Sequence, residues 1–189
     1  LISGIVEPNE FSRKQGGLLL PLVWQWNHNP DYKLSSIIDR KGFLRITTGR
    51  IDTSFFLAKN TLTQRTVGPE CRGSTFVDVS HMKEGDFAGL ALLQKKFGMV
   101  GVRYESGRKS VVMVNAESGK SVEVQRVPLL QNMIYLKIEC NFKNMTDTAN
   151  FFYSHDGKSW TLIGSSLHMA YTLPHFMGYR FGLFNYASK

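Results

Sequence analysis

Short segments of alternating apolar and polar side chains, separated by glycine-containing turns, restrict the fold of this chain more than any other feature. Residues 42–48 and 133–140 show the period-two pattern of half-buried strands and are rich in β-branched residues. Turn signals such as 84–86, 105–107 and 117–119 lie between the strands. Further candidate strands, about ten residues apart, are 54–66, 72–79, 87–95, 98–105, 109–116, 120–127, 148–154, 159–164 and 178–186. This spacing predicts an all-β fold, an antiparallel sandwich or barrel.

The alternation also assigns strand faces. In residues 133–140 the side chains expected in the core are Ile134, Leu136, Ile138 and Cys140. The intervening polar side chains are expected to face outward. Residues 88–94 are apolar on both faces, which predicts a central strand that is covered on each side. Gln94 ends one face of that strand, where a ligand could reach it.

Size and composition indicate one domain, residues 1–189, with no linker or internal repeat. The chain is 42% hydrophobic, yet no apolar run approaches the ~20 residues that span a bilayer, so no membrane partner is expected. Residues 1–11 lack the basic start and apolar middle of a signal peptide, which favours a mature or excised domain. The net charge is +8, but the basic residues are scattered, so nucleic acid is not expected as a partner.

The two cysteines, Cys71 and Cys140, are too few and too far apart for a zinc site. Either one disulfide or two buried thiols is compatible with their spacing. No metal and no cofactor is expected.

The segment 22–31 carries the clearest signal of function. Trp24 and Trp26 are two residues apart, so on a strand they share one face, and the polar turn with Asn27 and His28 follows directly. Aromatic rings cover the C–H face of a pyranose, while amides and imidazoles bind its hydroxyls. The residues therefore predict a sugar contact. The alternative is that the tryptophans fill the core and the turn residues satisfy backbone groups.

Further candidate ligand contacts lie elsewhere in the chain. Gln64 and Arg65 end a predicted strand, and the five donors of an arginine suit vicinal hydroxyls. The alternative for Arg65 is an ion pair with Glu70. Tyr179 alternates with its neighbour near the end of the chain, so only one of the two can face a given groove. His28 lacks a second ligand at metal-binding spacing.

The acidic residues do not predict catalysis. Glycoside hydrolysis needs two carboxyl groups about 5–10 Å apart across the bond. The acids in or beside predicted strands are Glu70, Asp78, Glu123 and Glu139, and none forms a Glu-x-Asp-x-x-Glu arrangement. Residues 154–156 combine Ser, His and Asp, but neighbours in sequence point in different directions, so a hairpin turn is expected there. The chain alone is expected to be non-catalytic.

Seven motifs in order carry a family resemblance. They are residues 24–30 (WQWNHNP), 42–48 (GFLRITT), 60–65 (NTLTQR), 68–71 (GPEC), 86–94 (DFAGLALLQ), 153–160 (YSHDGKSW) and 173–181 (LPHFMGYRF). From about Glu10 to Lys189 the chain resembles the C-terminal β-sandwich module of glycoside hydrolase family 43 enzymes, mainly β-xylosidases and α-L-arabinofuranosidases. The resemblance implies a concanavalin A-like jelly roll of two antiparallel sheets, related to xylan-binding modules.

The family also implies partners. Catalysis is expected in a separate five-bladed propeller, against which the sandwich packs and to whose pocket it lends a side chain. The first hypothesis is a non-catalytic module that holds xylan or a xylo-oligosaccharide or completes that pocket. The alternatives are a purely structural domain and a lectin-like glycoside hydrolase in its own right. Polysaccharide degradation suggests a periplasmic or extracellular location, although imported oligosaccharides are also degraded in the cytoplasm.

Two departures from the family pattern are apparent. The chain has Asn9 where relatives usually have an aspartate. It also ends at Lys189, whereas relatives continue through a Gly-rich turn into a closing strand. That final strand is therefore expected to be missing, and a calcium ion joining it to the N-terminal strand is not expected.

Overall fold

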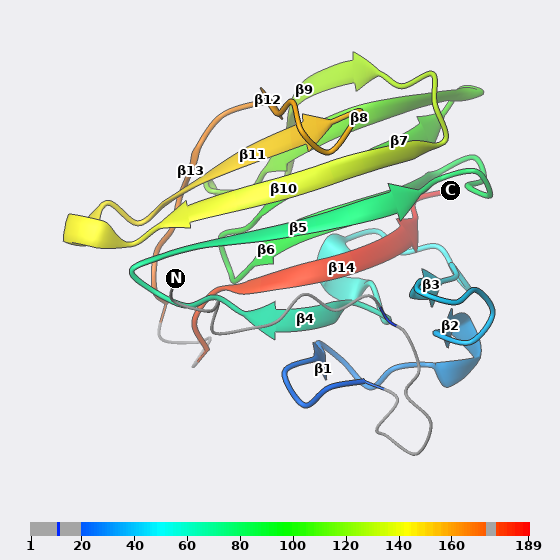
Figure 1. Cartoon of the computed structure of the whole chain (residues 1–189), viewed down its shortest axis with the longest axis horizontal. Coiled ribbons are helices and arrows are strands. Elements are labelled where there is room, and N and C mark those ends of the chain that lie inside the picture. Colours follow the sequence, from blue (N-terminus) through cyan, green and yellow to red (C-terminus); the bar gives the residue numbers. More distant parts are fainter. Residues whose placement is uncertain (1–10, 12–19, 173–176) are drawn as a thin grey trace.

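The computed structural model describes residues 11, 20–172 and 177–189, and it contains two β-sheets stacked face to face (Figure 1). The larger sheet has seven strands, ordered β1-β4-β14-β6-β7-β8-β9. Their bounds are β1 Gln25–Trp26, β4 Leu62–Arg65, β14 Arg180–Ala187, β6 Asp86–Leu93, β7 Gly98–Glu105, β8 Arg108–Asn115 and β9 Val122–Pro128. Residues 1–10, where no signal peptide is expected, lie outside the described part.

The smaller sheet has the order β12-β11-β10-β5, and β13 also pairs with β11. Its strands are β12 Thr161–Leu162, β11 Thr148–Ser154, β10 Met133–Asn141, β5 Glu70–Asp78 and β13 Leu167–His168. A separate ribbon joins β2 (Ser35–Ser36) to β3 (Arg45–Ile46), and three 3-10 turns complete the described elements: η1 Tyr32–Leu34, η2 Phe55–Leu57 and η3 Lys143–Met145. None of these helical turns is long and apolar enough to cross a membrane.

The prediction of an all-β antiparallel sandwich is confirmed, because the named strands pair antiparallel throughout. The strand predicted over 54–66 is wrong in its first half, where η2 occupies 55–57 and only 62–65 form a strand. The Ser54 hydroxyl accepts a hydrogen bond from the Phe56 backbone N–H at 3.3 Å and so begins the turn. The turn directs Phe55 onto Phe97 and Phe184, with ring centroids 5.2 Å away in each case.

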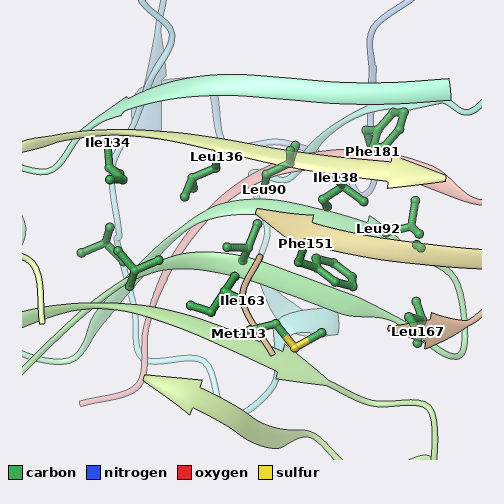
Figure 2. Packing of buried hydrophobic residues seen from close by; sticks show 14 of the residues in the cluster. Leu90, Leu92, Met113, Ile134, Leu136, Ile138, Phe151, Ile163, Leu167 and Phe181 are labelled. Carbon is green, nitrogen blue, oxygen red and sulfur yellow. The ribbon is translucent and has the colours of Figure 1, made fainter. Parts of the chain in front are cut away.

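The main core lies between the two sheets and confirms the predicted faces of β10. Ile134, Leu136 and Ile138 are fully buried, and Cys140 is 3% exposed. Figure 2 shows the side chains of Ile134, Leu136 and Ile138 in one cluster with Leu90 and Leu92 of β6 and Phe151 of β11. We call the surface of each sheet that points into this core its inner face.

A second apolar cluster covers the other face of the larger sheet. Phe87, Ala91 and Leu93 of β6 lie in it, packed with Phe55 and Phe184. The prediction that residues 88–94 form a central strand covered on both sides is therefore confirmed. The segment before β4 covers this outer face, and for that reason its side chains do not follow a strand period.

Candidate functional site

Strand register brings several predicted ligand contacts to one face of the larger sheet. Phe181, a residue of the main core, pairs with Gln64 on one side and Leu92 on the other, so Gln64 faces inward. Leu62 is two residues from Gln64 on β4 and therefore faces the same way, and it pairs with Trp26 of β1. Trp26 therefore faces inward, and the exposed Gln25 faces outward. Trp24 lies directly before β1 and is half-buried like Trp26.

The smaller sheet does not extend over this edge. Its outermost strand is β5, and Gly73 of that strand lies against Phe181: a Cβ atom there would be 2.9 Å from the ring. Beyond β14, strands β4 and β1 continue past the edge of the smaller sheet (Figure 1). We call this edge, with its half-buried side chains Trp24, Trp26 and Gln64, the β1–β4 shelf.

The indole N–H of Trp24 has no hydrogen-bond acceptor among the described residues. Its indole Nε1 is buried and makes no hydrogen bond within the described parts of the chain, while its ring lies 5.6 Å from that of Phe11. A buried indole N–H usually has an acceptor, and an unpaired one costs about 1–3 kcal/mol. The Trp24 N–H is thus a buried donor without an acceptor among the described residues.

Gln94 and Tyr179 lie deeper than predicted. Gln94 is fully buried, and its Oε1 accepts hydrogen bonds from the Lys95 backbone N–H at 2.6 Å and the Thr172 hydroxyl at 3.0 Å. Tyr179 is 7% exposed, and its hydroxyl accepts from the Ala170 N–H at 3.1 Å. Burial also raises the pKa of Tyr179. In this conformation both side chains hold the segment 170–172 on the sheet and do not reach a ligand at the surface.

Asn27 and His28 hold the turn that follows β1. The Asn27 backbone N–H donates to the Thr61 carbonyl at 2.9 Å, and its side-chain amide lies 3.2 Å from His28 Nε2. The same His28 nitrogen lies 2.6 Å from the Phe56 carbonyl and, when protonated, donates to it. The His28 ring remains exposed beside the shelf. The two residues therefore fit the alternative in which they satisfy backbone groups, and a ligand contact by either stays a prediction.

Arg65 lies on the opposite face of the sheet from the shelf tryptophans. It pairs across the ladder with Arg180, whose guanidinium Nη1 donates to Gln25 Oε1 at 2.6 Å and to the Thr63 hydroxyl at 3.2 Å. The suggested ion pair with Glu70 is wrong, because Glu70 instead pairs with Lys143 at 2.6 Å. Within the described residues Arg65 has no ion-pair partner, so its role as a ligand contact stays a prediction.

Next to the turn lies a polar cavity that the sequence did not indicate. Asn60 is 4% exposed and makes two hydrogen bonds with the Asp31 backbone: Oδ1 accepts from N–H at 2.9 Å, and Nδ2 donates to C=O at 2.8 Å. Both residues line a cavity of about 140 Å³ together with Asp52 and Asn185. Asn185 Oδ1 is buried and has no hydrogen-bond partner among the described residues. Of the sequence features, only the motif at 60–65 includes a residue that lines this cavity. Nothing in the sequence around Asn185 indicates that it contributes to a site.

The side-chain arrangement suits a neutral, hydroxyl-rich ligand better than a metal ion. No group of three or more His, Cys, Asp or Glu side chains able to hold a metal occurs in residues 11, 20–172 and 177–189. The shelf offers two aromatic rings and an amide, and the adjacent turn adds an exposed imidazole. These groups match the C–H faces and hydroxyls of a sugar.

Comparison with known proteins connects this arrangement to one family. A beta-xylosidase from Formosa agariphila is 28% identical over 192 residues, covering 90% of this chain and 31% of that protein. A solved bifunctional GH43-CE protein from Bacteroides eggerthii is 60% identical with a TM-score of 0.96, covering all of this chain and 24% of that one.

A second solved neighbour is a GH43 glycoside hydrolase engineered for endo-xylanase and exo-arabinofuranosidase activity. It is 29% identical with a TM-score of 0.85, and the match covers 95% of this chain and 37% of that chain. The chain thus spans 24 to 37% of these relatives, and in the two solved neighbours the domain is attached to a GH43 catalytic domain. Residues 10–189 match the beta xylosidase C-terminal concanavalin A-like domain, and the chain belongs to that family.

Proposed function

We propose that this chain is a non-catalytic accessory domain of a xylan-degrading family 43 glycoside hydrolase, and that it holds a xylose-containing chain on the β1–β4 shelf. The observation that carries the proposal is the position of Trp24, Trp26 and Gln64 together at one edge of the larger sheet. Trp26 and Gln64 share its inner face, and the Trp24 N–H is unpaired among the described residues. Relatives named as a beta-xylosidase and as an endo-xylanase and exo-arabinofuranosidase support the ligand class.

Binding at the shelf would be modest. A sugar exchanges hydroxyl–water hydrogen bonds for similar bonds to protein, so each new bond contributes only about 0.5–1.5 kcal/mol. The favourable excess comes from stacking on the indole rings and from the rigidity of the ladder between β1, β4 and β14. Because the shelf lies at a sheet edge, a long polysaccharide can lie across it, and no chain end has to bind there. These properties suit a module that keeps substrate near a separate active site.

The environment of the acidic residues supports a non-catalytic role. Each of the four strand acids considered above has a basic partner in an ion pair. The pairs are Glu70–Lys143, Asp78–Arg40, Glu123–Arg126 and Glu139–Lys137. A general acid for glycoside hydrolysis needs a raised pKa, whereas the pKa of Asp78 is lowered.

A second role, docking to the adjoining catalytic propeller, is favoured by the distribution of exposed apolar side chains. Six of them lie in the segment 22–57, which precedes β4: Leu22, Val23, Tyr32, Ile38, Ile51 and Leu57, at 84, 44, 75, 65, 62 and 49% exposure. Exposed apolar side chains concentrated in one segment are typical of an interface. Trp24 and Trp26 of the shelf belong to the same segment. Docking through its exposed apolar side chains would hold the shelf beside the catalytic pocket, so the two roles are compatible.

The test is isothermal titration of the 189-residue chain with xylohexaose, with cellohexaose as the control ligand. We expect heat with xylohexaose and a loss of affinity of at least about fivefold in Trp24→Ala and Trp26→Ala, because each removes a stacking surface. Trp160→Ala, which removes the third tryptophan, beside the smaller sheet, is the matched control and should bind as the parent chain does. If the shelf variants retain full affinity, sugar binding at the shelf is excluded, and docking remains as the function.

A further inference from the structure

The outer face of the smaller sheet contains a cleft that none of the preceding argument uses. It has a volume of about 470 Å³, within the range of about 300–1,000 Å³ that is typical of ligand sites. The cleft lies where β5 ends, β10 begins and the loop 155–160 leaves β11. We call it the outer-face cleft; its lining includes Phe76, Gln131, Asn132, Met133, Tyr135 and His155.

Aromatic rings form the floor of the outer-face cleft. Tyr135 of β10 pairs directly with Phe76 of β5, and their ring centroids are 4.5 Å apart with 35° between the planes. The row continues to Phe43, 6.3 Å from Phe76, and the Arg40 guanidinium stacks on Phe43 at 3.8 Å. These rings point away from the main core, because Leu136 on the same strand points into it. An aromatic row on an outward sheet face is a surface on which a flat ligand can stack.

The backbone keeps one edge of this floor open. Gly157 has φ +72° and lies beside Tyr135, and a Cβ atom there would be 3.1 Å from the tyrosine ring. Any other residue at 157 would be strained and would also crowd the ring. The loop is fixed by Asp156, whose carboxylate accepts hydrogen bonds from the backbone N–H groups of Lys158 and Ser159, both at 2.8 Å. These bonds lower the pKa of Asp156 and compensate its charge locally.

The remaining polar groups at the cleft are neutral donors and acceptors. Three of them make no hydrogen bond in the described parts of the chain: the Tyr135 hydroxyl, the His155 imidazole and the Asn132 side-chain amide nitrogen. Beside the cleft, Lys109 is bonded to Asn132 Oδ1 at 2.7 Å. A hydroxyl-rich neutral ligand would find both hydrogen-bonding partners and a stacking surface here.

We propose that the outer-face cleft binds pyranose units of a neutral glycan, as a second sugar site distinct from the β1–β4 shelf. The two sites lie on different sheets, and a long polysaccharide that engaged both would be held more tightly than by either alone. The inference goes beyond the shelf and stands independently of it.

Backbone amide chemical shifts of the isotopically labelled 189-residue chain test the proposal during titration with xylohexaose and, separately, cellohexaose. We expect shifts at residues 131–135 and 155–157 with at least one of the two ligands. The affinity measured there should fall about 2- to 10-fold in His155→Ala, which removes one exposed hydrogen-bonding group. It should fall about tenfold or more in Tyr135→Leu, which removes the stacking ring.

Trp24→Ala separates the two sites, since it should leave the cleft response unchanged while it weakens the response at 24–28 and 62–65. Because Tyr135 is half-buried, its variant is compared only after its urea midpoint is measured; the exposed His155→Ala provides the same test without that concern. If neither ligand shifts residues 131–157, or if the shifts survive both cleft variants, the outer-face cleft is not a glycan site, whatever the shelf does.

Discussion

Cys71 and Cys140 face each other as a directly registered pair across the antiparallel strands β5 and β10. Both are free thiols; Cys140 is 3% exposed and Cys71 is partly buried. A hydrogen bond from Cys140 lowers the pKa of Cys71 to about 7, although burial acts in the opposite direction. The same interaction and burial raise the pKa of Cys140. Of the two states that the sequence left open, a disulfide or two thiols, the structure has two free thiols.

The first prediction concerns the reactivity of this pair. The rate of Cys71 alkylation by iodoacetamide should rise with pH with a midpoint at about 7, because the thiolate is the nucleophile. In Cys140→Ala the donor is lost, so the midpoint should move up toward the ordinary value of about 8.5. Mass spectrometry of the modified peptide at a series of pH values measures both. An identical midpoint in the two proteins would contradict the proposed hydrogen bond.

The same shifts give the pH dependence of stability. The folded-state pKa of Cys71 lies below its unfolded value, so the unfolded chain binds more protons between the two. The stabilisation that Cys71 provides is fully present above its unfolded-state pKa of about 8.5 and is lost as the pH falls through about 7. The raised pKa of Cys140 acts oppositely and lowers stability at higher pH. The urea midpoint of the parent chain should therefore rise from pH 6.5 to 8.5, and less so in Cys71→Ser.

The second prediction concerns the like-charged pair Arg65 and Arg180, which oppose each other across β4 and β14. The pKa of Arg180 is lowered, first by burial and then by the charge of Arg65. Arg65→Glu should replace repulsion with attraction and stabilise the fold by about 0.5–1 kcal/mol at low salt. Urea denaturation with and without about 1 M NaCl measures the gain and its screening.

The matched control is Lys120→Glu, which makes the same charge change in the exposed turn between β8 and β9. It should change the free energy of unfolding by less than about 0.5 kcal/mol. An equal gain in the two variants would show that net charge, not the Arg65–Arg180 pair, is responsible. Arg65→Glu also tests the predicted sugar contact by Arg65, since loss of xylohexaose binding without loss of stability would support it.

The alternation of apolar and polar residues predicted the regular strands. It did not predict the segments whose conformation depends on contacts with residues far away in the sequence. The period of two identified β10 with its buried face, because that face meets one continuous core. It failed for 54–61, where contacts of Phe55 with β14 and the loop before β7 favour a turn. The common face predicted for Trp24 and Trp26 stays a prediction, because only Trp26 lies in β1. The burial of Gln94 and Tyr179 did not follow from spacing, because 170–172 return from a distant part of the chain to cover them.

The third prediction concerns Asn60, which joins the loop after β1 to the start of β4 through both backbone groups of Asp31. Asn60→Ala removes two hydrogen bonds and leaves the Asp31 N–H unpaired in a buried site. The free energy of unfolding should fall by about 2–4 kcal/mol. Urea denaturation measures the loss, and Asn29→Ala, at an exposed amide, is the control that should change little. A loss below about 0.5 kcal/mol for Asn60→Ala would show that water replaces the side chain.

The fourth prediction concerns the contact between Gly98 of β7 and Phe151 of β11 across the main core. A Cβ atom on Gly98 would lie 2.3 Å from the tip of the Phe151 ring, which is fully buried. Gly98→Ala should therefore destabilise the fold by about 1–3 kcal/mol through overpacking. Phe151→Leu alone should also cost about 1–2 kcal/mol because it leaves a cavity.

Combined in one chain, the two changes should offset each other, since the methyl group added at position 98 fills space that the shorter leucine vacates. The double variant should be more stable than the sum of the single losses by about 0.5–3 kcal/mol. Urea denaturation of all four proteins measures this coupling. Gly178→Ala, where a Cβ atom would meet nothing within 4 Å, is the control and should stay within about 0.5 kcal/mol of the parent. Strictly additive losses would mean that Phe151 does not limit the space at Gly98, and that the two sheets separate locally to admit the methyl group.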